Sequence, residues 1–237
     1  MNSAIEARQN HLLAALDGPD WERWAPHLER VELPLGQVLY ESGAILSHVY
    51  FPTNSIVSLL YVMQSGESAE IAVVGNDGLV GVALFMGGDS TSSRAVVQNA
   101  GQAFRIKAQF IMSEADMPVP RLLLRYVQAL MTQMTQTAAC NRHHALPQQL
   151  CRWLLLSLDR LPGNKLVMTQ QLIANMLGIP VDGVAAGARE LEKDGMIRMV
   201  DGSITVLDRA GLERLTCECY AVVKKEYDRL LPPTQVH

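Results

Sequence analysis

The side chains best suited to chemistry with another macromolecule cluster between residues 169 and 207, in "TQQLIANMLGIPVDGVAAGARELEKDGMIRMVDGSITVL". Thr169, Gln170 and Gln171 begin a short apolar-periodic stretch, where hydroxyl, amide and backbone N–H groups can bind phosphate. Arg189 lies about two turns into a second such stretch, where a contact to phosphate or guanine is available. These residues indicate hydrogen bonding to a nucleic acid.

The elements expected to carry these residues form a helix-turn-helix with a wing. Thr169 is a typical N-cap, Gly178 a typical helix C-terminus, and Pro180 suits the first turn of a second helix that reaches Lys193. The apolar Val184, Ala188 and Leu191 share one face of that helix. Asp201-Gly202 between two apolar runs predicts a β-hairpin, and a hairpin behind a helix-turn-helix is a wing.

The first part of the chain has a different pattern. From about 31 to 117, short runs of alternating apolar and polar residues are separated by turn residues such as Ser42-Gly43, Ser65-Gly66 and Gly75-Asn76-Asp77-Gly78. This spacing predicts a small antiparallel barrel or roll. Two amphipathic stretches before residue 30 predict short helices that cover one end.

A longer helix is expected between these parts. Apolar residues recur there at alternating steps of four and three, which is the pattern of a coiled-coil seam, and they are Leu123, Val127, Leu130, Met134 and Ala138. Periodicity alone leaves two interpretations open. The helix packs on its own barrel, or it pairs with the same helix of a second chain.

Composition narrows the class of protein. The 237 residues are 49% hydrophobic and 19% charged, as in globular proteins, and neither a membrane-spanning run nor a signal peptide is evident, so a cytoplasmic location without membrane association is expected. The net charge of −4 lies entirely before residue 147, because the rest has 11 basic and 11 acidic residues. A neutral DNA-binding region must gather its basic residues on one face.

Catalytic and metal chemistry are not expected. The sequence contains no P-loop, no Gly-x-Gly-x-x-Gly fingerprint and no His-Glu-x-x-His motif, so no enzymatic activity is predicted. The four cysteines, Cys140, Cys151, Cys217 and Cys219, form no Cys-x-x-Cys pair and are interpreted as reduced thiols. Cys217 and Cys219 lie two apart in a helix-like stretch, which points their side chains to different faces, and no metal ligand is assigned.

The order β-roll, long helix and winged helix-turn-helix resembles the cyclic AMP receptor protein/FNR (Crp/Fnr) family of bacterial transcription regulators. The resemblance is most specific in "CNRHHALPQQLCRWLLLSLDRL", "TQQLIANMLGI" and "RMVDGSITVLDR". It implies an α+β fold with a cyclic-nucleotide-binding-like sensor (1–118), a dimerisation helix (119–146) and a winged helix-turn-helix domain with an added C-terminal helix (147–237).

The resemblance also implies a homodimer that binds a palindromic double-stranded DNA operator, with RNA polymerase as a candidate partner. It assigns DNA contacts to the starts of both short helices and to the wing, at Thr169, Gln170, Gln171, Val181, Asp182, Gly183, Ala185, Ala186, Arg189 and Arg198. The reading helix departs from the family, because Val181, Asp182 and Ala186 stand where Arg, Glu and Arg are usual. Looser or relocated specificity is therefore expected. The alternative is a regulator with weakened DNA reading that acts through protein contact.

The resemblance places a tentative effector pocket at Gly81, Val82, Arg94 and Ala95. Val82 replaces the Glu that binds the ribose of cyclic AMP, and Ala95 replaces a hydroxyl residue that binds its phosphate, so cyclic AMP is disfavoured. Arg94 either holds another anion or forms a surface salt bridge.

Iron–sulfur and haem chemistry are the other sensor mechanisms to consider. No cysteine precedes Cys140, so no iron–sulfur cluster of the FNR type is expected. The sequence leaves haem open because His11, His27 and His48 precede the long helix. His143 and His144 close that helix, where hydrogen bonding explains them as well as ligation does.

Overall fold

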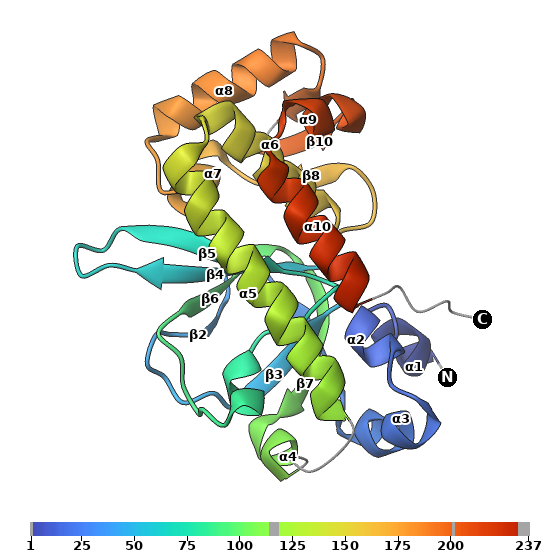
Figure 1. Ribbon diagram of the computed structural model, residues 1–237. Helices are drawn as coiled ribbons and strands as arrows, with labels where there is room; N and C mark the ends of the chain where they lie inside the picture. Colours follow the sequence, from blue (N-terminus) through green and yellow to red (C-terminus); the bar gives the residue numbers. More distant parts are fainter. Residues whose placement is uncertain (1, 114–118, 201, 232–237) are drawn as a thin grey trace.

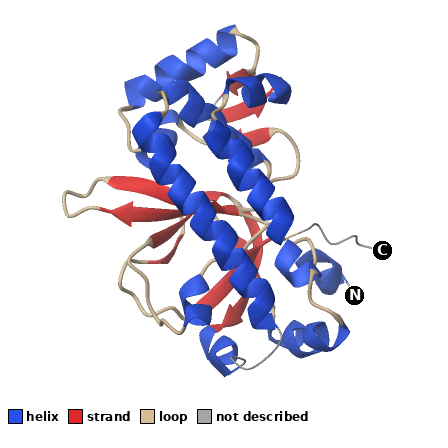
Figure 2. Ribbon diagram, viewed as in Figure 1, coloured by secondary structure: helices blue, strands red, loops and turns tan. Residues whose placement is uncertain are grey.

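The computed structural model describes residues 2–113, 119–200 and 202–231 (Figure 1). Asp201 of the predicted hairpin turn and Pro118 at the predicted domain boundary lie outside the described residues. The chain forms a β-rich part and a mostly helical part, which are joined by one long helix that runs along both (Figures 1 and 2).

The β-rich part is the predicted roll, built from two antiparallel sheets. One has the order β1-β7-β3 and the other the order β2-β6-β4-β5. The strand bounds are β1 Glu29–Leu33, β2 Val38–Tyr40, β3 His48–Pro52, β4 Ile56–Val62, β5 Ser68–Val74, β6 Arg94–Asn99 and β7 Gly101–Lys107. Two of the predicted turns contain glycines with positive φ, Gly43 at 77° and Gly66 at 87°, a conformation that other residues rarely adopt.

Short helices before residue 30 cover one end of the roll, as expected, and two short helical segments from later in the chain were not predicted. They are α1 Asn2–Ala7, α2 His11–Ala14, α3 Gly18–Trp24, the 3₁₀ turns η1 Ala25–His27 and η2 Val82–Met86, and α4 Ala108–Ser113. Trp24 anchors them, because its ring packs edge-on against Phe51 and Phe110 and is stacked against Phe85, with centroid distances of 6.2, 5.8 and 6.5 Å.

The long helix α5 (Val119–His143) lies across the roll and buries one side against it. Tyr126 is fully buried, and its hydroxyl donates to the carbonyl of Leu79 over 2.9 Å. Its ring passes so close to Gly78 that a Cβ there would lie 2.5 Å from a ring carbon. Gln133, also buried, donates to the carbonyl of Val73. These bonds satisfy polar groups at the interface and fix the rotation of α5 about its axis.

The remaining elements form the predicted winged helix-turn-helix and its extra helix. They are α6 Leu146–Leu158, β8 Lys165–Val167, α7 Gln170–Leu177, α8 Val181–Lys193, β9 Ile197–Val200, β10 Ser203–Val206, α9 Arg209–Leu215 and α10 Glu218–Leu230. The three strands form a sheet in the order β8-β10-β9. Helix α10 returns along α5 (Figure 1).

Buried polar side chains hold the helical part on the roll. The Glu70 carboxylate of β5 accepts hydrogen bonds from the Ser58 hydroxyl at 2.6 Å and from the Trp153 indole N–H of α6 at 3.1 Å. Arg160, just after α6, is 2% exposed and pairs with Asp77 at 2.9 Å and with Gln133 of α5 at 2.8 Å. One carboxylate and one guanidinium thus connect α6 with the roll and with α5.

Glu70 makes the stability of this seam depend on pH. Burial raises the pKa of Glu70 from 4.5 to about 7, although the hydrogen bond from Ser58 and the charge of Arg152 oppose the shift. The folded chain therefore keeps a proton that the unfolded chain releases between these two values. This stabilisation is complete below pH 4.5 and is lost as the pH rises through about 7.

We expect Glu70→Gln to remove this dependence, because the amide does not ionise. The free energy of unfolding of the parent chain should fall relative to that of Glu70→Gln, by about 3 kcal/mol, as the pH rises through this window. Urea unfolding at several pH values measures it, with the exposed Glu67→Gln as control. Parallel curves for parent and Glu70→Gln would contradict the assignment.

Candidate nucleic-acid interface

The local signals of the helix-turn-helix are confirmed. Thr169 is the N-cap of α7, and its hydroxyl accepts from the backbone N–H of Leu172 at 3.3 Å. Gly178 ends α7 in the left-handed conformation with φ 66°. Pro180, in extended conformation, is the N-cap of α8, whose predicted inner face of Val184, Ala188 and Leu191 is buried.

Helix α8 packs closely on α6 through two glycines. A Cβ on Gly183 would lie 3.2 Å from a methyl of Leu146, and one on Gly187 would lie 3.4 Å from a methyl of Leu150. Gly183 is among the predicted DNA contacts, but it faces α6 at this approach. Its role in the structure is to bring the two helices together.

The outward face of α8 carries the other predicted reading residues. Asp182, Ala186 and Arg189 are exposed and follow one another at helical steps of four and three, so they share one face. Val181 and Ala185 are half-buried beside them. The helix lies at the end of the molecule far from α4, with this face turned to solvent (Figure 1). The fold therefore brings these residues to one accessible surface.

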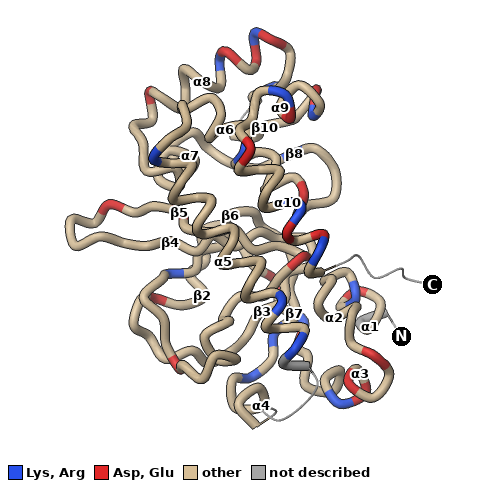
Figure 3. Tube along the Cα trace, viewed as in Figure 1, with Lys and Arg blue, Asp and Glu red and all other residues tan. Residues whose placement is uncertain are grey.

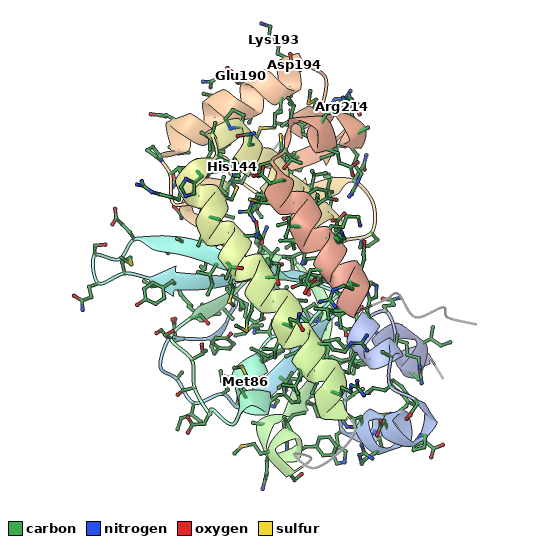
Figure 4. All side chains as sticks on the ribbon, in the orientation of Figure 1. Met86, His144, Glu190, Lys193, Asp194 and Arg214 are labelled. Atoms are coloured by element: carbon green, nitrogen blue, oxygen red, sulfur yellow. The ribbon has the colours of Figure 1, made fainter. Side chains whose placement is uncertain are left out.

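The charge of this surface is mixed. Helix α8 contains Arg189 and Lys193 against Asp182, Glu190 and Glu192, a formal balance of −1. Figure 3 shows both signs along its C-terminal half, and Figure 4 shows Glu190, Lys193 and Asp194 projecting there. Helix α8 alone supplies little attraction for phosphates, so basic groups of neighbouring elements have to contribute.

The wing, formed by β9 and β10, supplies one such basic group. Strands β9 and β10 pair from Val200↔Ser203 to Ile197↔Val206, which confirms the hairpin, and Arg198 of β9 is exposed. Glu192 of α8 accepts from the backbone N–H of Met199 at 2.9 Å and ties the wing to the reading helix.

Glutamines at the start of α7 are partly engaged within the chain. The Gln170 amide N–H lies 3.7 Å from the sulfur of Met199 in the wing, and the exposed Gln171 donates to Asn175 at 3.0 Å. The Thr169 hydroxyl is the helix cap. The unpaired backbone N–H groups of the first turn of α7 remain the donors best placed for a phosphate.

The residues predicted to line an effector pocket all lie in the roll, but they differ in burial and in their contacts. Gly81 is buried, has φ 102° and precedes η2, and Val82 is half-buried. Ala95 is fully buried within β6, between β2 and β4. Arg94 Nε lies 3.1 Å from a carboxylate oxygen of Glu41, so the surface salt bridge considered for Arg94 is present.

The three histidines considered for haem binding lie in two separate places. His27 and His48 line one cavity of about 540 Å³, together with Arg105 and Lys107, whereas His11 lines a different one beside Asp77 and Arg160. The pKa of His48 is lowered by burial and then by the charge of Arg105. His27 is stacked on Phe110 with centroids 4.1 Å apart. Haem stays a prediction that these contacts do not test.

The predicted dimer seam on α5 needs a correction. Leu123 and Leu130 are each 3% exposed because they pack on the chain's own roll, so they are unavailable to a second chain. Among the described residues of α5, the exposed large apolar side chains are Leu124 at 64% and Met131 at 58%. With Val127, Gln128, Thr132 and Thr135 they border a shallow groove on the free side of the helix. Val127, Met134 and Ala138 of the predicted seam are half-buried or exposed.

A cluster that the sequence interpretation missed lies at the end of α5. Cys140, His144, Cys217 and Cys219 approach one another there. The usable signal was the four-residue spacing of Cys140 and His144, which puts both on one helical face.

Among the described helices, none is long and apolar enough to cross a membrane.

The chain thus combines a double-sheet β-roll with a winged helix-turn-helix. The family model described as "Cyclic nucleotide-binding domain" matches residues 30–115, and that described as "Crp-like helix-turn-helix domain" matches residues 148–215. The chain belongs to the Crp/Fnr family and is a DNA-binding transcription regulator of that type. A search of curated proteins found no match.

Solved structures with the same fold are similar at low identity. FixK2 from Bradyrhizobium japonicum has a TM-score of 0.67 and 16% identity, over 80% of this chain and 98% of that one. TTHB099, a CRP-family regulator from Thermus thermophilus, has a TM-score of 0.64 and 17% identity, over 78% of this chain and 95% of that one. CLP from Xanthomonas campestris, described as c-di-GMP responsive, has a TM-score of 0.60 and 16% identity, over 79% of this chain and 97% of that one. These values support the fold.

The cap of α7 can be tested directly. Thr169→Ala removes the acceptor for the Leu172 N–H and should lower the free energy of unfolding by about 1 kcal/mol. Urea unfolding monitored by circular dichroism measures the change. Gln171→Ala, in the same helix and exposed, is the control and should have an effect within about 0.5 kcal/mol. Equal stabilities of Thr169→Ala and the parent would contradict the capping role.

Proposed function

We propose that this regulator acts as a homodimer that binds a palindromic operator through the exposed face of α8 and through the wing. The observation that carries the proposal is the joint exposure of Asp182, Ala186 and Arg189 on a helix at the molecular end. Reading helices of such dimers bind half-sites about one helical turn apart, roughly 34 Å.

Dimerisation is supported by the free side of α5. Leu124 and Met131 stand at a step of seven on that side, as residues of a coiled-coil seam do. Val127 lies between them, and Thr135 continues the stripe by four residues. Because the opposite side of α5 is packed on the roll, a second α5 can approach only from here. Pairing would cover Leu124 and Met131, the exposed large apolar side chains of the described part of α5.

Met131→Glu should convert the dimer to a monomer, because a carboxylate would be buried opposite its own copy. Sedimentation or light scattering at several concentrations measures the oligomeric state. The matched control is Met112→Glu, since Met112 of α4 is 59% exposed, against 58% for Met131. A Met131→Glu variant that remains dimeric at the parent's dissociation constant would contradict the proposed interface.

Phosphate binding is assigned to the wing and the start of α7. Arg198 is exposed on β9, next to the reading helix through the Glu192–Met199 contact. The acidic residues of α8 make the total electrostatic attraction to phosphates modest. Much of the binding therefore has to come from contacts with base edges. Asp182 can accept from a cytosine amino group, and Arg189 can donate to guanine or to phosphate.

Arg198→Ala should weaken binding to any duplex and lower the salt slope of log Kobs by about 1, because one phosphate contact is lost. Fluorescence anisotropy with one labelled duplex over a range of salt concentrations measures the slope. Lys107→Ala, which removes a basic residue from the roll, should leave the slope unchanged. An unchanged slope for Arg198→Ala would place the wing away from DNA.

The effector is proposed to be neither cyclic AMP nor an iron–sulfur cluster. Val82 offers no carboxylate to a ribose hydroxyl, and buried Ala95 offers no hydroxyl to a phosphate. Arg94 is paired with Glu41, which competes for any anion. No cysteine precedes Cys140 in this chain, so it lacks the N-terminal ligands of an FNR-type cluster.

One observation favours the alternative, a regulator that acts through protein contact. The α8 surface has a net negative formal charge, and Glu190, Glu192 and Asp194 are exposed near its end. Such a surface repels phosphate and suits a basic partner. Salt-sensitive association with a basic protein, with no DNA binding at low salt, would favour it over the proposed operator reader.

A further inference from the structure

Three thiols and one imidazole from distant parts of the chain converge where α5 ends. The potential ligand atoms of Cys140, His144, Cys217 and Cys219 all lie within 4.8 Å of one another. The Sγ atoms of Cys140 and Cys217 are 3.5 Å apart, and Cys219 Sγ lies 3.6 Å from His144 Nδ1. All three cysteines are at most 4% exposed. Figure 4 shows His144 beside the start of α10.

The local structure explains how these side chains meet. Cys140 and His144 are four residues apart, and the His144 N–H still donates to the Cys140 carbonyl, so both side chains leave the same face of the helical turn. Cys217 is the N-cap of α10 with φ −86° and ψ 167°, and Cys219 is in its first turn. Because Cys217 stands outside the helix, the expectation that Cys217 and Cys219 face apart does not apply.

We propose that these four residues bind one Zn²⁺ ion in a Cys₃His site that joins α5 to α10. Tetrahedral zinc with Zn–S distances of about 2.3 Å sets neighbouring sulfurs roughly 3.8 Å apart. The sulfur–sulfur distance between Cys140 and Cys217 and the sulfur–nitrogen distance between Cys219 and His144 are both close to that value. The widest pair, at up to 4.8 Å, needs an inward shift of about 1 Å. Three thiolates and an imidazole form a ligand set typical of closed structural zinc sites.

Neighbouring residues complete the site. Glu218 Oε2 lies 3.2 Å from His144 Nε2, which directs the other ring nitrogen, Nδ1, toward the thiols. A carboxylate behind a metal-binding histidine is the usual support for its orientation and basicity. Three thiolates around Zn²⁺ leave a net charge of −1. The guanidinium of the buried Arg152 supplies the opposite charge, since it interacts electrostatically with the Cys140 side chain.

The position of the site gives it a structural consequence. His144 is two residues before α6, where the long helix passes into the DNA-binding part, and Cys217 immediately precedes the added C-terminal helix. The same helix pair is in contact further along, where Gln128 donates to Glu226 at 3.0 Å and Tyr227 to Gln133 at 3.3 Å. Zinc would therefore clamp α10 to α5 at the junction, while these bonds hold the other end.

Metal content tests the proposal on the full chain, purified without chelators and without an affinity metal. Elemental analysis should find about one Zn²⁺ per chain. Cys219→Ser should lose it. Cys151→Ala is the matched control, because Cys151 is also fully buried but lies outside the cluster, and it should keep the ion. Cys219→His, which retains a ligand atom, should restore binding in part. Circular dichroism establishes that each variant is folded.

Cobalt provides a second readout that does not depend on the metal loaded during expression. Co²⁺ added to metal-free protein should give the visible bands of tetrahedral thiolate coordination, and Zn²⁺ should abolish them. Glu218→Gln should weaken the affinity by about tenfold or more. A parent chain with neither zinc nor the cobalt bands would overturn the proposal, as would zinc retained by folded Cys219→Ser. So would iron in place of zinc. Neither readout involves DNA, so their outcome is independent of the proposed function.

Discussion

The arrangement of the molecule depends on two buried ionisable groups at the seam between roll and helices. Glu70 accepts from Ser58 of its own sheet and from Trp153 of α6, and Arg160 joins Asp77 of the roll to Gln133 of α5. Removing either partner would leave a polar group buried without a bond, which costs more than the bond contributes. The seam therefore admits few alternative packings, and it fixes where α6 points.

The position of α6 determines the position of the rest of the candidate nucleic-acid interface. Gly183 and Gly187 let α8 approach α6 closely, which turns the opposite face of α8 to solvent. Helix α7 lies against β5. The sulfur of Met176 in α7 lies 3.4 Å from the hydroxyl of Ser58 in the neighbouring strand β4, and that hydroxyl also binds Glu70. The first helix of the helix-turn-helix thus touches a buried hydroxyl of the roll that belongs to the same hydrogen-bond network as Glu70.

The sequence predicts the elements whose signals are local. Thr169, Gly178 and the hairpin at Gly202 each have a short-range reason to be where they are, and the structure agrees with them. The rotation of α5 was harder to predict, because Leu123 and Leu124 belong to two adjacent apolar stripes and both fit a seam. The hydrogen bonds of Tyr126 and Gln133 to loop and strand carbonyls choose between the stripes, and no local pattern contains those partners. The cysteine cluster was missed for the same reason, since Cys140 and Cys217 are 77 residues apart.

The most direct test of the account is selection of bound duplexes from a random pool by the purified protein, run in parallel with Arg189→Ala. The account predicts an enriched palindrome with half-sites about one helical turn apart, and relaxed preference at one symmetric pair of positions for Arg189→Ala. Bound DNA without any enriched sequence, or an enriched palindrome that Arg189→Ala and Asp182→Ala both leave unchanged, would contradict a reading role for the exposed face of α8.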